Sequence, residues 1–171
     1  MTEESYISFL KLCAELHPLI LNDDQTNVRF SKFGEEIVTQ IAAGGVLKIT
    51  EPCLVTYCQE FESSVIDSGP QTIKSTTFNF EICQYAQPND FQAQKVAQNT
   101  AEAIATDIIN EMKAYYFNDI PPFNHGVKIS DRIQGNNTAG GKASLYGYRV
   151  ELTITSPVSS GENHTLFTTI I

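Results

Sequence analysis

The chain has 171 residues, of which 42% are hydrophobic, with 11 basic and 20 acidic side chains. This length suits one domain and is too short for two ordinary ones, and a chain of this size can bury an adequate core without metal or disulfide staples. The net charge of -9 disfavours non-specific nucleic-acid binding, because such binding depends on Lys and Arg that neutralise phosphates. Residues 1–67 carry 11 acidic and 4 basic side chains, whereas residues 68–171 carry 9 and 7. We therefore expect an acidic N-terminal part that faces solvent or a basic partner.

The N-terminus predicts the cellular compartment and, through it, the state of the cysteines. It is acidic where a signal peptide is basic, and no apolar run approaches the roughly 18 residues of a membrane span. We expect a cytoplasmic protein with no membrane partner. In that compartment the four Cys are predicted to be reduced, buried thiols.

Two short helices are predicted before any strand. Residues 3–17 have apolar side chains at helical spacing, with Thr2 as N-cap and Pro18 after the end. A second helix is predicted to begin at a Ser31 cap and to stop at Gly44-Gly45. Its apolar face consists of Phe33, Ile37, Val38 and Ile41.

The residues from 46 to 85 predict strands. A short apolar segment, 46–49, is followed by Pro52 and by a strand rich in β-formers over Cys53–Phe61. A polar loop over 62–71 leads into a strand with Phe78, Phe80 and Ile82 on one face. With a turn near Gly69-Pro70, the two strands would form a long hairpin that places Cys58 opposite Cys83.

The clearest element is a helix over residues 91–117, capped by Asp90. Apolar residues recur there at three- and four-residue steps, and small alanines among them predict close packing on a sheet. The apolar positions are Ala97, Ala101, Ile104, Ala105, Ile108, Met112 and Tyr115.

Further strands are predicted after this helix, within 127–133, over 145–154 before Pro157, and over Thr165–Ile171, with a flexible loop at 134–144. Thr165–Ile171 is expected to pair within its own subunit or to complete a neighbour's sheet. The whole order predicts one α+β domain over 1–171, with a largely antiparallel sheet and one long amphipathic helix packed on it. Residues 1–45 would form the helical N-terminal part, and 46–171 the sheet with the long helix.

One segment resembles a phosphate-binding loop, Gly140-Gly141-Lys142-Ala143-Ser144. The P-loop pattern needs a Gly where Asn136 stands, a hydroxyl where Ala143 stands, and a following helix where a strand is predicted. We therefore expect no nucleotide site, and a mobile hairpin loop with Lys142 in solvent.

Metal and catalytic patterns are equally weak. Cys53 and Cys58 with His17 or His125 would be a minimal zinc set, but the two thiols have opposite parity on a strand. A packing role is expected for all four cysteines, although Cys58 and Cys83 could bridge in an oxidising medium. No nucleophile elbow accompanies the three His, and the helix carboxylates fit a solvated face. The three His are His17, His125 and His164, and the helix carboxylates are Glu102, Asp107 and Glu111. The sequence predicts no catalytic, cofactor-binding or metal-binding residue and hence a non-enzymatic binding or assembly protein.

A family resemblance rests on the element order and on several segments. These are residues 33–37, the Pro-containing strand entry 49–54, the strand end 78–82, the helix from Asp90, and the closing strand 146–154. Together they resemble the tail-completion or tail-terminator proteins, which are head–tail connector components, of Bacteroidetes prophage-like loci. The resemblance implies an α+β subunit that assembles into a ring, often a hexamer, at the head–tail junction, and no catalytic residues. It also implies tail-tube and connector proteins as partners and incorporation into a virion or phage-like particle.

If that resemblance holds, the segments 62–71 and 134–144 are expected to be the contact arms between neighbouring copies. One alternative is a small-ligand-binding α+β domain with a curved sheet, whose lining residues would be Tyr57, Phe78, Phe80 and Tyr148. The same four residues equally fit the core of a sheet. The other alternative is an enzyme with a dispersed site.

Overall fold

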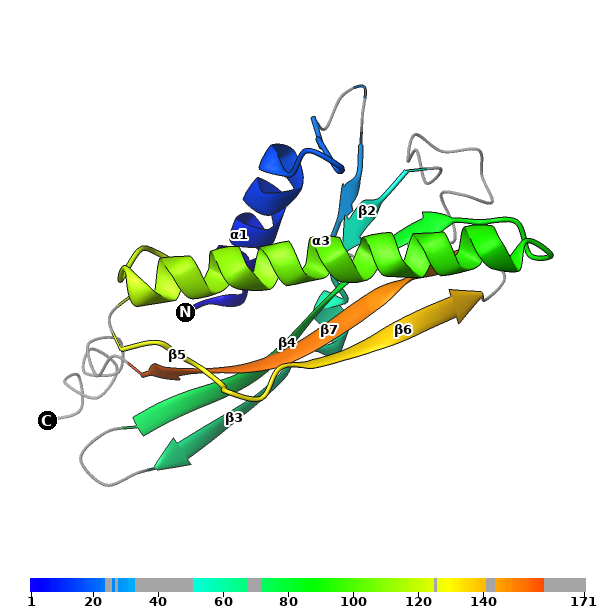
Figure 1. The fold of residues 1–171 in the computed structure, drawn as a ribbon. Helices are drawn as coiled ribbons and strands as arrows, with labels where there is room; N and C mark the ends of the chain where they lie inside the picture. The colour runs from blue at the N-terminus through cyan, green and yellow to red at the C-terminus, as the bar shows by residue number, and fades with distance from the viewer. Residues whose placement is uncertain are drawn as a thin grey trace, which may run out of the picture.

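The computed structural model describes residues 1–23, 26, 28–32, 51–67, 72–124, 126–140 and 144–158. In these residues the chain has an α+β fold, with a seven-stranded sheet and two α-helices (Figure 1). The elements in chain order are α1 (Glu3–Leu16), β1 (Phe30–Ser31), β2 (Cys53–Val55), the 3-10 helix η1 (Cys58–Glu60), β3 (Glu62–Asp67), β4 (Thr72–Tyr85), α3 (Phe91–Phe117), β5 (Lys128–Ile129), β6 (Gln134–Gly140) and β7 (Leu145–Pro157).

Two long strands, β4 and β7, form the centre of the sheet. They pair antiparallel from Ile73–Pro157 to Tyr85–Leu145. The order is β1-β2-β4-β7-β5, with β3 also paired to β4 and β6 also paired to β7. Only the β1–β2 pair is parallel among the described strands. The prediction of a largely antiparallel sheet is confirmed.

Both helices begin at side-chain caps. Thr2 and Ser5 form a reciprocal capping box at the start of α1, and His17 ends that helix as expected before Pro18. Asp90 caps α3 by accepting a hydrogen bond from the Ala93 N–H at 2.9 Å. The predicted bounds of α3 are confirmed, and the buried residues of the helix are Ala97, Ala101, Ile104, Ala105, Ile108 and Met112.

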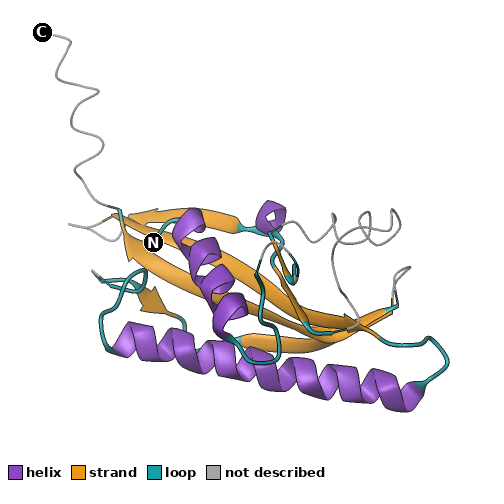
Figure 2. Ribbon diagram, turned by 90° about the horizontal axis from the view of Figure 1, so that it is seen from above, coloured by secondary structure: helices purple, strands orange, loops and turns teal. Residues whose placement is uncertain are grey.

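The core lies between one face of the sheet and the two helices. Alternation along β4 directs Phe78, Phe80 and Ile82 to this face, where each is at most 2% exposed. The ring of Tyr6 from α1 stacks on Phe78 with centroids 4.2 Å apart. Figure 2 shows α3 running along the sheet and α1 crossing it at an angle. One cluster of buried residues joins both helices to β4 and β7.

The segments 62–71 and 134–144 were predicted as long polar loops, and these predictions are wrong for residues 62–67 and 134–140, while 68–71 and 141–143 lie outside the described residues. Residues 62–67 form β3 and residues 134–140 form β6. Ser, Asn and Gly have low strand propensity in isolation, but pairing with a long central strand overrides that preference.

The predicted strand over Cys53–Phe61 is correct only for its first three residues. β2 ends at Val55, and the chain leaves the sheet through η1 before β3 begins at Glu62. The interruption shifts the register, so Cys83 lies opposite Cys53 and not opposite Cys58. All four cysteines are free thiols.

Some predictions fall partly or wholly outside the described residues. These predictions are the second short helix after Ser31, the segment 46–49, the turn at 69–70 and the strand Thr165–Ile171. Ser31 itself lies in β1, a strand that the sequence did not predict.

Candidate functional site

The strand β3 has an edge that no other described strand covers. It pairs with β4 from Glu62–Thr77 to Asp67–Thr72, and its other side is open within the described part of the chain. Val65 and Ile66 are consecutive, so their side chains point to opposite faces of the sheet. They are 67% and 53% exposed. An uncovered edge with exposed apolar residues on both faces is suited to pairing with another chain.

The strand β6 has a second uncovered edge. It pairs with β7 in continuous register from Gln134–Glu151 to Gly140–Leu145, and no described strand lies on its other side. Its sequence, QGNNTAG, contains no charged residue and no Pro. Edge strands are normally protected against association by Lys, Pro, bulges or short length, and seven regular residues without these devices are unprotected.

The two open edges lie on opposite sides of the central β4–β7 pair. β3 adds to β4, whereas β6 adds to β7. A contact between the β3 edge of one copy and the β6 edge of the next would join two different surfaces. Such a heterologous contact can repeat around a ring, and each added copy would extend the sheet.

A buried carboxylate fixes β6 to the rest of the sheet. Glu81 of β4 is only 7% exposed. Its Oε1 accepts a hydrogen bond from Thr138 Oγ1 of β6 at 2.6 Å, and its Oε2 accepts one from the Tyr57 hydroxyl at 2.7 Å. One side chain therefore links β6, β4 and the segment that enters η1.

The same carboxylate determines the chemistry of Tyr57. Burial raises the pKa of this phenol above its ordinary value, and the charge of Glu81 and its hydrogen bond raise it further. Both effects favour the protonated form of the hydroxyl, in which it donates to Glu81. It acts as a structural donor and is unsuited to acid–base catalysis near neutrality.

Arg149 lies beside this pair but is neutralised. Its guanidinium lies over the Tyr57 ring, 4.7 Å from the centroid, and forms ion pairs with Glu60 and, at 3.5 Å, with Glu151. A hollow of about 410 Å³ opens here; its lining also includes Glu62. Three carboxylates around one guanidinium make this hollow unfavourable for phosphate or other anions.

The residues considered for metal or acid–base chemistry do not come together. In the described part of the chain no group of three or more His, Cys, Asp or Glu has the geometry of a metal site. His17 accepts a hydrogen bond from the Leu19 N–H at Nδ1, and its Nε2 lies 3.5 Å from Asp107. Glu102, Asp107 and Glu111 are exposed along α3. His125, His164 and Lys142 lie outside the described residues.

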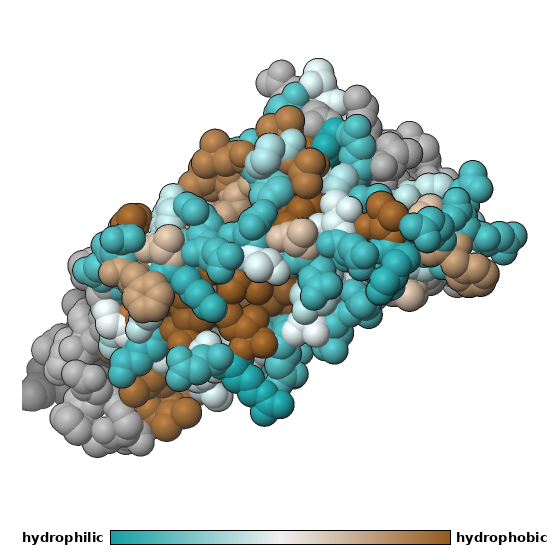
Figure 3. Space-filling model, viewed as in Figure 1, coloured by the Kyte–Doolittle hydropathy of each residue, from teal (hydrophilic) through white to brown (hydrophobic). Residues whose placement is uncertain are grey.

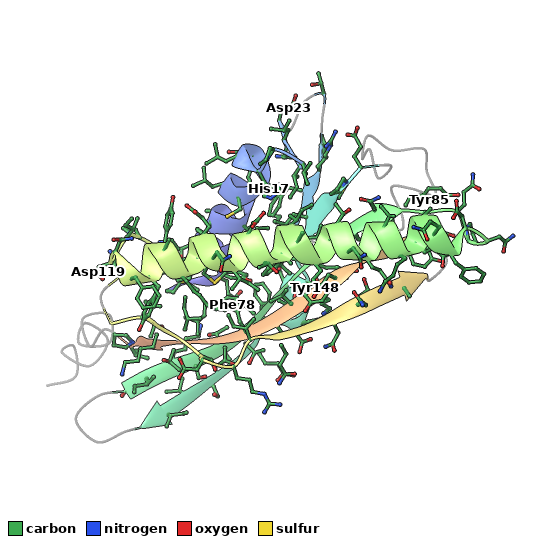
Figure 4. The ribbon with its side chains drawn as sticks, viewed as in Figure 1. His17, Asp23, Phe78, Tyr85, Asp119 and Tyr148 are labelled. Atoms are coloured by element: carbon green, nitrogen blue, oxygen red, sulfur yellow. The ribbon has the colours of Figure 1, made fainter. Side chains whose placement is uncertain are left out.

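The four aromatic residues proposed as a ligand-binding lining are also separated. Phe78 and Phe80 are buried in the core, and Tyr148 is half-buried on the same face of the sheet beneath α3 (Figure 4). Tyr57 bonds to Glu81, whose neighbours in β4 point to the opposite face. The structure therefore gives these four residues no common pocket.

The chain was compared with known protein families and with curated proteins. No protein-family model matches the chain, and no curated protein matches it. Among the described helices, none combines the length and apolar character that a membrane-crossing helix needs. The described residues form an α+β fold in which no described strand covers the outer sides of β3 and β6. Sequence reasoning missed this feature because both strands were predicted as loops.

Proposed function

We propose that this protein is a non-enzymatic assembly subunit that forms a closed ring through its sheet edges, as the resemblance to phage tail-terminator and head–tail connector proteins implies. The observation that carries the proposal is that β3 and β6, on opposite sides of one sheet, each have an outer side that no described strand covers. Each edge supplies the backbone donors and acceptors that the other needs. Ring closure would leave neither edge exposed.

The charge distribution supports pairing of β3 with β6 over pairing of β3 with β3. β3 has an acidic residue at each end, Glu62 and Asp67. Pairing β3 with a second β3 would bring two acidic sequences together, whereas the β6 sequence contains no charged residue. The heterologous contact is therefore the favoured one.

Two proline variants test the contact and control for each other. Asn136 and Asn137 are adjacent and exposed in β6, so their N–H groups point to opposite sides of the strand. Asn136→Pro and Asn137→Pro each remove one donor, but only one of them removes a bond to β7. The variant that keeps the parent's urea midpoint is expected to lose the oligomer in size-exclusion chromatography with light scattering.

A charge at the β3 edge gives an independent test. Val65→Lys and Ile66→Lys change exposed side chains, so the subunit should fold normally and fail to assemble. Val96→Lys, at a half-exposed position on α3, is the matched control and should assemble as the parent does. An oligomer that survives both edge changes argues against this contact.

The phage assignment has its own test. The resemblance implies that the gene lies beside tail-tube, tape-measure or portal genes, and that the ring binds the end of a tail tube. Electron microscopy of purified tail tubes mixed with the protein should show added density at one tube end. Tubes without such density at any protein excess would contradict the head–tail role while leaving ring assembly to be judged by mass.

A further inference from the structure

A groove runs between α1 and α3, away from both open edges. Its floor consists of buried apolar side chains, Phe9 and Cys13 from α1 and Ile108 from α3. Tyr115 packs edge-on against Phe9 with centroids 5.3 Å apart, and His17 with Pro18 also lines the groove. The cavity has a volume of about 290 Å³, at the lower limit for small-ligand pockets, and it is open to solvent.

One wall of the groove is an apolar ridge on α1. Leu12 and Leu16 are one helical turn apart and line the groove, and Leu16 is 71% exposed. Leu19, just beyond the end of the helix, is 51% exposed. Figure 3 shows hydrophobic surface, coloured brown, over α1 above α3. Exposed leucines beside an apolar floor are typical of a docking surface.

The other wall is acidic. Asp107 and Glu111 are also one turn apart, lie on α3 and line the groove, and both are exposed. Glu15 on α1 pairs with Lys11 at 3.9 Å, and His17 lies 3.5 Å from Asp107. The titratable side chains of Cys13 and Tyr115 also line the groove, and the Arg29 guanidinium donates to the Leu19 carbonyl at 3.3 Å. The surface thus combines an apolar ridge and floor with carboxylates along one side.

We propose that this groove binds an amphipathic helix of another protein, with apolar side chains in the groove and Lys or Arg against Asp107 and Glu111. Helices bind such grooves through apolar residues at spacings of three, four and seven. A second copy that presented its own acidic wall, or an anionic lipid surface, would meet Asp107 and Glu111 with like charge, so these charges favour a basic partner helix.

The absence of Trp from the chain provides the assay. A synthetic amphipathic peptide of about five turns, with Leu at helical spacing, one Trp on the apolar face and Lys on the flank, reports binding through its own fluorescence. The matched peptides replace Lys by Glu, or scramble the sequence at constant composition. The Lys peptide is expected to bind at least about tenfold more tightly than either at low salt, with a difference that shrinks as salt is added.

Two pairs of variants locate the site. Leu16→Ser should weaken binding about tenfold or more, whereas Phe91→Ser, which also changes a highly exposed apolar residue of a helix, should not. Glu111→Lys should reverse the preference between the Lys and Glu peptides, whereas Glu102→Lys, elsewhere on α3, should preserve it. All four positions are exposed, so circular dichroism should show the parent's fold.

Three results would overturn the proposal. The first is equal binding of the Lys, Glu and scrambled peptides, and the second is an equal effect of a groove variant and its control. The third is that Leu16→Ser leaves the affinity for the peptide unchanged but changes the solution mass of the protein or its sedimentation with phosphatidylglycerol vesicles. Because the groove contains neither β3 nor β6, failure of this test leaves ring assembly untouched, and loss of the ring leaves this test valid.

Discussion

The hydroxyl of Tyr6 is a buried polar atom with no hydrogen-bond partner among the described residues. The side chain is fully buried, and its ring stacks on Phe78 and meets Phe61 edge-on at 5.9 Å. An unsatisfied buried hydroxyl is destabilising by about 1–3 kcal/mol, because it has lost its bonds to water. Tyr6→Phe removes this atom and keeps every ring contact. We expect the free energy of unfolding to rise by about 1 kcal/mol and Tm by about 2–4 °C.

Tyr57→Phe is the matched control, because the same atom is removed where it has a partner. The Tyr57 hydroxyl donates to Glu81 at 2.7 Å, and Glu81 is buried. Loss of a hydrogen bond to a buried charged group should lower the free energy of unfolding by about 1.5–3 kcal/mol. Urea titration followed by far-UV circular dichroism measures both variants. If Tyr6→Phe destabilises the protein, or both variants shift in the same direction, the reasoning on these two hydroxyls is refuted.

Three further predictions use the same unfolding assays or thiol chemistry. Gly147→Ala places a methyl against a backbone carbonyl of β4 and should lower the free energy of unfolding by about 3 kcal/mol or more. Gly135→Ala meets only the end of a Tyr side chain, which can be displaced, and should change it by less than about 1 kcal/mol. Equal effects of the two variants would contradict the packing. Ellman's reagent should titrate half-buried Cys58 first in the native protein, and a second fast thiol would be inconsistent with the structure. Burial, with a further contribution at Cys13 from a nearby Glu, raises the pKa values of Cys13 and Cys53 to about 12. Since the unfolded state loses these protons first, stability should fall between about pH 9 and pH 12, by up to about 1.4 kcal/mol per pH unit for each thiol, and Cys13→Ala should reduce the slope; an unchanged slope would contradict the burial of that thiol.

The parts of the fold that were predictable are those determined by local pattern. The helix α3 has a capping Asp90 and a stripe of apolar residues along its length, and its bounds were predicted correctly. The strand β7, Leu145–Pro157, was predicted over 145–154 from its apolar residues at alternate positions and the Pro that ends it. In both elements, propensity, periodicity and end residues agree.

The parts that were missed depend on distant partners. β6 is a strand only because β7 pairs with it residue by residue, and its Gly and Asn residues predict a loop. Nothing local to Tyr57 or Cys58 indicates that the chain leaves the sheet there, since the segment is rich in β-formers throughout. The open edges were therefore not predictable, because an edge is a property of the sheet order and not of any one segment.

The interaction surfaces were predictable only in part. Leu12 and Leu16 lie on α1 and Leu19 lies just beyond its end, and all three are exposed apolar residues that the sequence contains but that sequence reasoning did not single out. That they form a groove with Asp107 and Glu111 depends on how α1 crosses α3, which the sequence does not encode locally.

The central claim is that copies of this chain close into a ring through the edges of β3 and β6. Native mass spectrometry of the full chain, repeated over a hundredfold range of protein concentration, measures this directly. A closed ring predicts one predominant species with an integral number of at least three copies, because closure pairs the β3 and β6 edges of every subunit. A monomer at every concentration, or a series of open oligomers that grows with concentration, would contradict it.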